Sequence, residues 1–303
     1  MVRVPGGEFA MGSDGFYPEE QPVHRVGVDD LWVDEHPVTV AQFRRFVKDT
    51  GYVTDAERAP AAEDYPDADP DLLVAGSLVF RAAAGPVPLD DWTQWWEWMP
   101  GADWRHPEGP GSNLNGRDRH PVVHVTHADA SAYAAWSGKR LPSEAEWERS
   151  ARGGLDGAVY PWGDDPTPKG KPMANTWQGE FPWQNLLLDG FAGTSPVKHF
   201  PPNGYGLYDV VGNVWEWTDD YFTPLHAAAE SKPCCVPINP RVDSPDASYG
   251  HGQVGEQFAR RVIKGGSHLC APNYCLRYRP AARQGQTIDS STAHLGFRCV
   301  IHP

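Results

Sequence analysis

The 303-residue sequence contains few cysteines and lacks the segments that mark a membrane or secreted protein. No apolar run approaches the ~18 residues of a membrane helix. The start, MVRVPGGEFAMGS, has no apolar stretch of the signal-peptide kind. Five cysteines are too few, and odd in number, for a disulfide scaffold. We therefore expect a cytoplasmic protein, in which thiols stay reduced and a cysteine pair is more often catalytic or metal-binding than structural.

Clusters of positive charge are also missing. The chain has 26 Lys and Arg against 40 Asp and Glu, a formal net charge of −14. Nucleic-acid binding is not expected, because it requires basic clusters that neutralise phosphates. An acidic surface suits a cationic peptide partner, although a role in solubility alone also accounts for it.

Several familiar catalytic motifs are absent. We find no GxGxxG, P-loop, HExxH, paired CxxC or GxSxG pattern, and the 12 histidines form no His-x-x-x-His cluster. A single histidine such as His124 or His127 is more often a satisfied structural residue than a ligand. Nucleotide, zinc-protease and serine-hydrolase chemistry of the usual kinds are thereby excluded.

Glycine, proline and tryptophan, by contrast, are abundant, with 31, 30 and 13 copies. This composition predicts a loop-rich fold whose core is filled by aromatic side chains. Capping boxes and helical spacing indicate three helices, in VAQFRRFVKDT (40–50), HADASAYAAWSG (127–138) and EAEWERSARGG (144–154). Short strands are expected in GEFAMGS (7–13), HRVGV (24–28), VVHV (122–125), SPVKHF (195–200), RRVIKGGSH (260–268) and LGFRCV (295–300).

No repeat and no linker divides the chain, so we expect one α+β domain over residues 1–303. Residues 54–120 are rich in Pro, Asp and Trp without clear periodicity, which indicates a long packed excursion. Residues 223–258, which hold Cys234 and Cys235, have the composition of a surface insertion.

Two of the five cysteines, Cys270 and Cys275, flank the segment APNY. An offset of five places their thiols on opposite faces of a strand, or about 140° apart on a helix. A β-turn over Ala271–Tyr274, with Pro and Asn at its centre, would bring them together. The spacing leaves open a disulfide, two ordinary buried thiols, or a metal or redox site. Two thiolates without a nearby histidine suit Cu(I), whereas structural zinc requires four ligands.

Longer segments carry a family resemblance. HPVVHVTHADASAYAAWSGKRLPSEAEWERSARGG, YPWGDD, ANTWQGEFP, PPNGYGLYDVVGNVWEWT, KGGSHLCAPNYCLRYRPAAR and DSSTAHLGFRCV occur in this order. Together they resemble the formylglycine-generating enzymes, or sulfatase-modifying factors, of the bacterial aerobic type. The resemblance implies a single α+β domain, poor in regular structure and related to C-type lectins. The segment around Cys270 and Cys275 is the most specific, since catalytic members carry this pair.

The resemblance implies an oxidoreductase that converts the cysteine of a Cys-x-Pro-x-Arg motif, in an unfolded sulfatase polypeptide, to Cα-formylglycine. O₂ would be the acceptor, and Cys270 and Cys275 would hold the Cu(I) cofactor. Ser267, Tyr274 and Trp215 would surround the copper and oxygen pocket. Trp215 is equally typical of a hydrophobic core, and Ser267 of a turn. We expect a monomer that binds neither nucleic acid nor membrane.

Two structural calcium sites are also implied by the resemblance. Side-chain oxygens and carbonyls would come from Asn175, Thr176, Asp189 and Phe191 for one ion, and from Asp209, Val210, Gly212, Val214 and Glu216 for the other. The segment DVVGNVWE has a carboxylate at each end of a glycine-bearing bend, an oxygen-rich pattern that Ca²⁺ accepts. Solvated carboxylates would give the same pattern.

The sequence departs from better-known relatives at several positions. Pro280 and Ala151 stand where cysteine-rich relatives have disulfide cysteines, so Cys299 is expected to be an unpaired core thiol. Ala271 stands where relatives can carry a histidine. The alternative function is a non-catalytic, lectin-like binding module of the same fold. An iron-dependent sulfoxide synthase is excluded, because the chain has no His-x-x-x-His-x-Glu motif.

Overall fold

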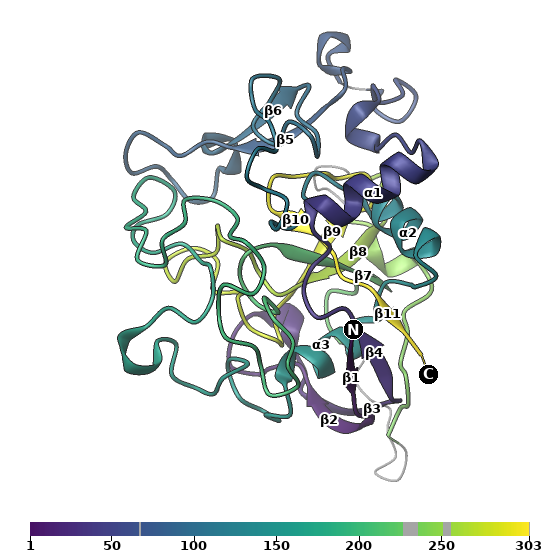
Figure 1. The fold of residues 1–303 in the computed structure, drawn as a ribbon, viewed down its shortest axis with the longest axis vertical. Coiled ribbons are helices and arrows are strands. Elements are labelled where there is room, and N and C mark those ends of the chain that lie inside the picture. The colour runs from purple at the N-terminus through teal and green to yellow at the C-terminus, as the bar shows by residue number, and fades with distance from the viewer. Residues whose placement is uncertain (67, 227–235, 251–255, 303) are drawn as a thin grey trace.

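The fold consists mostly of loops that connect short helices and strands (Figure 1). The computed structural model describes residues 1–66, 68–226, 236–250 and 256–302. It contains three α-helices, α1 (Val40–Thr50), α2 (His127–Trp136) and α3 (Glu144–Arg152). In the described part of the chain, no helix has the length and apolar character needed to cross a membrane.

The three expected helices are confirmed, and local chemistry explains their bounds. Each begins with a capping box, at Thr39, Thr126 and Ser143. Helices α1 and α3 end at Gly51 and Gly153, both in the left-handed conformation that favours glycine.

The strands form two small sheets and two hairpins. The four-stranded sheet has the order β10-β7-β8-β9, and the three-stranded sheet has the order β1-β4-β11. Strand β2 pairs with β3, and β5 with β6, both antiparallel. The bounds are β1 (Val2–Val4), β2 (Gly7–Met11), β3 (His24–Val28), β4 (Leu31–Val33), β5 (Gly76–Phe80), β6 (Trp96–Pro100), β7 (Trp215–Tyr221), β8 (Arg260–Lys264), β9 (Arg283–Thr287), β10 (Leu295–Gly296) and β11 (Val300–Ile301).

Three strand predictions need correction. Residues 122–125 and 195–200 are not strands, because His124 and Lys198 have φ angles of 60° and 65°, outside the extended region. LGFRCV contains two strands instead of one, since β10 pairs with β7 and β11 with β4. The excursion over 54–120 contains the hairpin β5–β6, which the sequence did not predict. His124 is a satisfied structural residue, hydrogen-bonded to Ser77 Oγ and to the Pro107 carbonyl.

The expected insertion at 223–258 is only partly described. The segment 236–250 is tied to the N-terminal hairpin, since the Gly27 amide donates to the Pro237 carbonyl and the Asn239 amide to the Gly27 carbonyl, both at 2.8 Å. The expectations for Cys234 and Cys235 fall outside the described residues.

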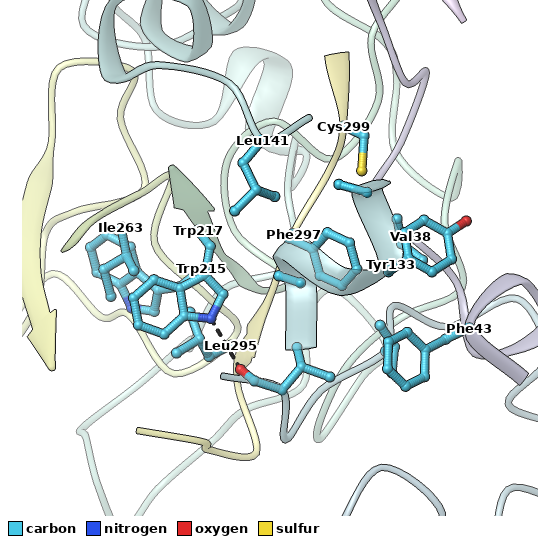
Figure 2. Close-up of a cluster of buried hydrophobic side chains, with 14 of the residues drawn as sticks. Val38, Phe43, Tyr133, Leu141, Trp215, Trp217, Ile263, Leu295, Phe297 and Cys299 are labelled. Atoms are coloured by element: carbon cyan, nitrogen blue, oxygen red, sulfur yellow. Dashed lines mark hydrogen bonds between the residues drawn. The ribbon is translucent and has the colours of Figure 1, made fainter. Parts of the chain in front are cut away.

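The main hydrophobic core joins α1, α2 and the four-stranded sheet through aromatic rings (Figure 2). Phe43, Tyr133 and Phe297 pack together, with ring centroids 5.3 to 6.4 Å apart. Trp217 of β7 donates from its indole to the Val125 carbonyl at 3.0 Å, so its one polar group is satisfied. Cys299 is a buried free thiol in this cluster, as expected. Cys270 and Cys275 belong to the same cluster, so the main core packs against both side chains.

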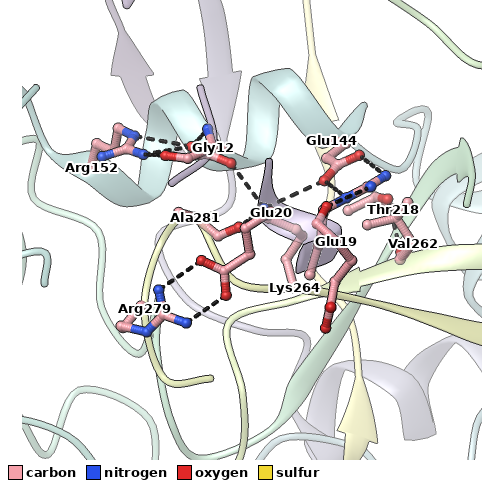
Figure 3. Close-up of polar contacts among 12 residues, drawn as sticks. Gly12, Glu19, Glu20, Glu144, Arg152, Thr218, Val262, Lys264, Arg279 and Ala281 are labelled. Atoms are coloured by element: carbon pink, nitrogen blue, oxygen red, sulfur yellow. Dashed lines mark hydrogen bonds and ion pairs between the residues drawn. The ribbon is translucent and has the colours of Figure 1, made fainter. Parts of the chain in front are cut away.

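A network of buried charges connects α3 to β8 and β9 (Figure 3). Lys264 is fully buried and lies 2.9 Å from a Glu148 carboxylate oxygen. Arg152 pairs with the same carboxylate at 2.7 Å, and Arg283 pairs with Glu144 at 2.6 Å. Buried charges need such partners, because an unpaired one would be strongly destabilising.

Glu148→Gln should lower the free energy of unfolding by about 3–5 kcal/mol near pH 7, because it leaves the buried Arg152 without a carboxylate partner and Lys264 with only its 3.5 Å contact to Glu144. Burial alone would raise the pKa of Glu148, but these two cations outweigh it and lower the pKa from 4.5 to about 2. The contribution is therefore present above pH 4.5 and is lost as the pH falls towards 2.

Urea unfolding at several pH values would measure this difference. Glu8→Gln is the control, because its pair with Arg25 is half exposed and should contribute less than about 1 kcal/mol. Two results would contradict a stabilising role of the Glu148 carboxylate: an equal loss of unfolding free energy in both variants, or a loss in Glu148→Gln that does not become smaller in acid.

Candidate functional site

Cys270 and Cys275 converge as a pair of free thiols. Their sulfur atoms lie 3.0 Å apart, about 1 Å more than the length of a disulfide bond. Both side chains are buried at the edge of the main core. Among the alternatives left open by the spacing, a disulfide is excluded in this structure.

The predicted turn brings the sulfurs together. The amides of Tyr274 and Cys275 donate to the Ala271 carbonyl at 3.2 and 2.9 Å, which folds the chain back over Pro272–Asn273. Gly266 allows the chain before Cys270 to pack closely against the backbone at Tyr278. Its φ is 69°, and a Cβ there would lie only 2.8 Å from the Tyr278 amide nitrogen.

The two thiols differ in their electrostatic surroundings. Burial and the hydrogen bond shared with Cys275 raise the pKa of Cys270 well above its usual range. The bond from Cys270 and the nearby Arg277 guanidinium lower the pKa of Cys275 to about 7. The pair therefore shares one proton readily, and its donor set is two soft sulfur atoms. Such a set fits a thiolate-preferring ion such as Cu(I), and the described residues offer no cluster of three or more His, Cys, Asp and Glu that would make a closed zinc site.

The sulfurs border a cavity of about 500 Å³. Six of the residues that line it are aromatic: Trp92, Trp95, Trp96, Phe181, Trp215 and Tyr274. The Tyr274 ring stacks on Phe181 with centroids 4.6 Å apart, and burial raises the pKa of the Tyr274 phenol to about 12. Trp215 is both a core residue and part of the cavity lining, so it matches the expectation of a pocket residue and that of a core residue.

Other residues that line the cavity are polar: Ser267, Gln284, Gln286, Thr287, Ser290, Thr292 and His294. Ser267 Oγ lies 3.0 Å from His294 Nδ1 and accepts from the Leu269 amide. Burial lowers the pKa of His294 to about 3, so the imidazole is neutral. Ser267 is thus a cavity residue with a defined partner.

The expectation of a site without a nearby histidine is wrong, because His294 borders the same cavity as the sulfurs. His268, two residues before Cys270, turns elsewhere and bonds to the Asn213 carbonyl at 2.8 Å. The only sequence signal for His294 is its place in the segment DSSTAHLGFRCV, and nothing local indicates that this segment returns to the cysteine turn.

Three of the four residues expected at the first calcium site converge. The Asp189 carboxylate accepts from the amides of Thr176 and Phe191, at 3.1 and 3.0 Å. The Gln178 amide nitrogen donates to both the Thr176 carbonyl and the Asp189 carboxylate, so a hydrogen-bond donor lies between these two oxygens. Asn175 Oδ1 is buried and has no hydrogen-bond donor among the described residues. The free Asn175 Oδ1 is therefore the observation that suits a calcium ion, which takes oxygen ligands.

The second expected calcium set fits less well. Both carboxylate oxygens of Glu216 accept from Arg298 at 2.7 Å, and one accepts from the Trp147 indole as well. The positive charge at Glu216 therefore comes from Arg298, which also donates to the Asp209 carbonyl. Burial raises the pKa of Asp209 to about 6. The participation of Glu216 does not fit this arrangement, whereas that of Asp209, Val210, Gly212 and Val214 stays a prediction.

Comparisons with known proteins agree over the whole chain. A family model described as sulfatase-modifying factor enzyme 1-like domain matches residues 1–303. The chain is 52% identical to the formylglycine-generating enzyme of Mycobacterium tuberculosis, over 100% of this chain and 98% of that protein. It is 40% identical to the inactive C-alpha-formylglycine-generating enzyme 2 of Bos taurus, over 99% and 87%. The solved structure of PvdO from Pseudomonas aeruginosa has a TM-score of 0.64 and 26% identity, over 99% and 92%, which agrees with the expected α+β fold class.

Because both thiols are free, protein that is denatured without reductant should be alkylated at Cys270 and Cys275, with Cys299 as an internal reference for a free thiol. Peptide mass spectrometry would measure the labelling. Labelling of the pair only after reduction, with recovery of a disulfide-linked peptide, would contradict the structure.

Proposed function

This chain belongs to the sulfatase-modifying factor family, and we propose that it converts a cysteine of a sulfatase polypeptide to Cα-formylglycine. The observation that carries the proposal is the pair of free thiols at 3.0 Å beside a partly aromatic cavity. A buried, reduced thiol pair of this kind suits a soft metal ion, and the cavity of about 500 Å³ is large enough for several residues of an extended peptide.

The chemistry can be written so that atoms and electrons balance. Oxidation of the substrate CH₂–SH group to a thioaldehyde releases two electrons and two protons. A thiol reductant supplies two more of each, and O₂ takes up all four to give two waters. One water then adds to the thioaldehyde, which releases hydrogen sulfide and leaves the aldehyde. The proposal therefore requires O₂ and an external thiol reductant.

Cys270 and Cys275 are the residues that would hold Cu(I). Their sulfurs are the right donors, and the Arg277 guanidinium favours the charged form of Cys275. When bound, Cu(I) supplies the one-electron reactivity towards O₂ that the side chains of this cavity lack.

The surrounding side chains bind and orient the reactants. Tyr274 keeps its phenolic proton at neutral pH and can donate a hydrogen bond into the cavity, because burial raises its pKa to about 12. Ser267 and the neutral imidazole of His294 can hold a proton between them at 3.0 Å. The buried Trp215 indole lines the cavity and limits the access of water to the thiol pair.

The substrate we propose is an unfolded segment with the motif Cys-x-Pro-x-Arg. A proline ring packs well on indole faces such as those of Trp92 and Trp96, and the net charge of −14 favours a peptide that carries arginine. We propose the cytoplasm as the place of action, where the three described thiols would stay reduced.

A peptide containing Leu-Cys-Thr-Pro-Ser-Arg, incubated with Cu(I)-loaded protein, O₂ and reductant, should lose the mass that corresponds to conversion of its cysteine to the aldehyde. Mass spectrometry measures this directly, and Cys270→Ser and Cys275→Ser should reduce the rate by orders of magnitude. Binding of the peptide without conversion would favour the alternative, a non-catalytic binding module; the relative from Bos taurus is itself named inactive.

We also propose calcium at the Asn175–Asp189 site, so chelation should lower the melting temperature of wild-type protein. An ion that binds only the folded state stabilises it by mass action, by about 2.7 kcal/mol at 100 times the dissociation constant. Asp189→Asn should melt at a lower temperature and respond less to chelator, while Asp156→Asn, at a surface pair with Arg25, should keep the wild-type response. A wild-type melting temperature that chelator leaves unchanged would contradict the proposal.

A further inference from the structure

The segment Phe16–Glu20, here called the N-terminal clamp, lies against the chain that follows Cys275. It contains the 3₁₀ helix η1 (Pro18–Glu20), and Pro18 restricts the backbone at its start. Two backbone hydrogen bonds of 3.0 Å, from Ser13 to the Glu20 carbonyl and from Gln21 to the Pro18 carbonyl, hold it in shape. The clamp is therefore a short but well-defined element.

Three contacts join the clamp to residues 276 and 277. The Leu276 amide donates to the Tyr17 hydroxyl at 3.0 Å. Arg277 pairs with Glu19 at 2.5 Å, and its guanidinium carbon lies 3.7 Å from the centre of the Tyr17 ring. These partners are about 260 positions apart in the sequence, so nothing local would impose the contacts.

A further ion pair anchors the clamp itself. Glu20 and Arg279 form a two-bond ion pair in which both side chains are almost completely buried (Figure 3). The Arg279 guanidinium also lies 3.6 Å from the centre of the Phe16 ring. This pair fixes the clamp against the protein, which leaves Tyr17 and Glu19 to act on the neighbouring Leu276 and Arg277.

The backbone transmits the position of Arg277 to Cys275. The Arg277 amide donates to the Cys275 carbonyl at 2.8 Å, which closes a tight turn between the two residues. Arg277 and Cys275 also border the same cavity, whereas Tyr17 and Glu19 do not line it. A shift of Arg277 therefore moves the second sulfur relative to the first.

We propose that Tyr17 and Glu19 are positioning residues of the thiol pair, which act through Leu276 and Arg277 to keep the Cys275 sulfur facing Cys270. The sequence of contacts runs from the anchored clamp to Arg277 and from Arg277 to Cys275. The catalytic importance of the pair rests on the proposed function, but its geometry does not.

The experiment compares Cu(I) binding by wild type, Tyr17→Phe and Glu19→Gln, by competition with a chelator and with the metal alone as the probe. Each substitution should weaken binding at least tenfold, because a loosened Cys275 loses preorganisation. With peptide substrate, kcat should fall while KM changes little, since neither residue lines the cavity. Glu19→Gln should not weaken Cu(I) binding further in an Arg277→Met background, because the guanidinium through which Glu19 acts on Cys275 is already absent.

Asp34→Asn is the matched control, because the Asp34–Lys139 pair has similar exposure to the Glu19–Arg277 pair. It should cost similar stability in thermal melting and leave Cu(I) affinity unchanged. Hydrogen exchange gives a metal-free measurement, in which the Leu276 amide should exchange at least tenfold faster in Tyr17→Phe and at the wild-type rate in Asp34→Asn.

Wild-type Cu(I) affinity and wild-type exchange in both clamp variants would overturn the inference. An equal loss of affinity in Asp34→Asn would also overturn it, because the effect would then follow general stability. If the wild type itself binds no Cu(I), the copper proposal fails, and the exchange rate alone decides whether the clamp holds the turn.

Discussion

One backbone hydrogen bond, from the Cys275 amide to the Ala271 carbonyl at 2.9 Å, sets the geometry on which the site depends. Without this turn, an offset of five residues would direct the two thiols apart on any regular element. With it, the sulfurs approach to 3.0 Å and share a proton. Every role proposed for the cavity, from metal ligation to the binding of an extended peptide, requires that the two sulfurs remain in this position.

A turn of this kind needs a rigid frame, and buried charges supply much of that frame. Lys264, Arg283 and Arg298 are each almost completely buried and each pair with a carboxylate. These pairs connect α3 to β8 and β9, and β7 to the segment that follows β10, so they join elements that are far apart in sequence. Such a frame is sensitive to the loss of a single partner. Removing one member of a buried ion pair leaves the other charge buried and unpaired, which is far more destabilising than breaking an exposed ion pair. The N-terminal clamp extends the same principle to the cysteine turn.

Local sequence signals predicted the helices and the cysteine turn correctly. Thr39 and Ser143 begin α1 and α3 because capping depends on neighbours within three residues, and the sequence signal for the turn, Pro272–Asn273, lies within the turn itself. The strand expected at 122–125 was wrong because alternation of apolar residues does not reveal the positive φ of His124.

His294 and Glu19 reach the site only through long-range packing, so no periodicity or motif spacing indicated them. Arg298 likewise could not be predicted as the partner of Glu216, since 82 residues separate the two. In a loop-rich fold, much of the functional geometry consists of contacts of this kind. The family resemblance compensates in part, because it identifies the residues of the pair and the cavity without explaining how they meet.

The most direct test of the central claim, that the two thiols form a soft-metal pair, is X-ray absorption at the copper edge of the Cu(I)-loaded protein. The account predicts two sulfur ligands and no nitrogen ligand in the wild type, and loss of this signature in both Cys270→Ser and Cys275→Ser. A nitrogen ligand in the first coordination sphere, or an unchanged spectrum in either serine variant, would contradict it.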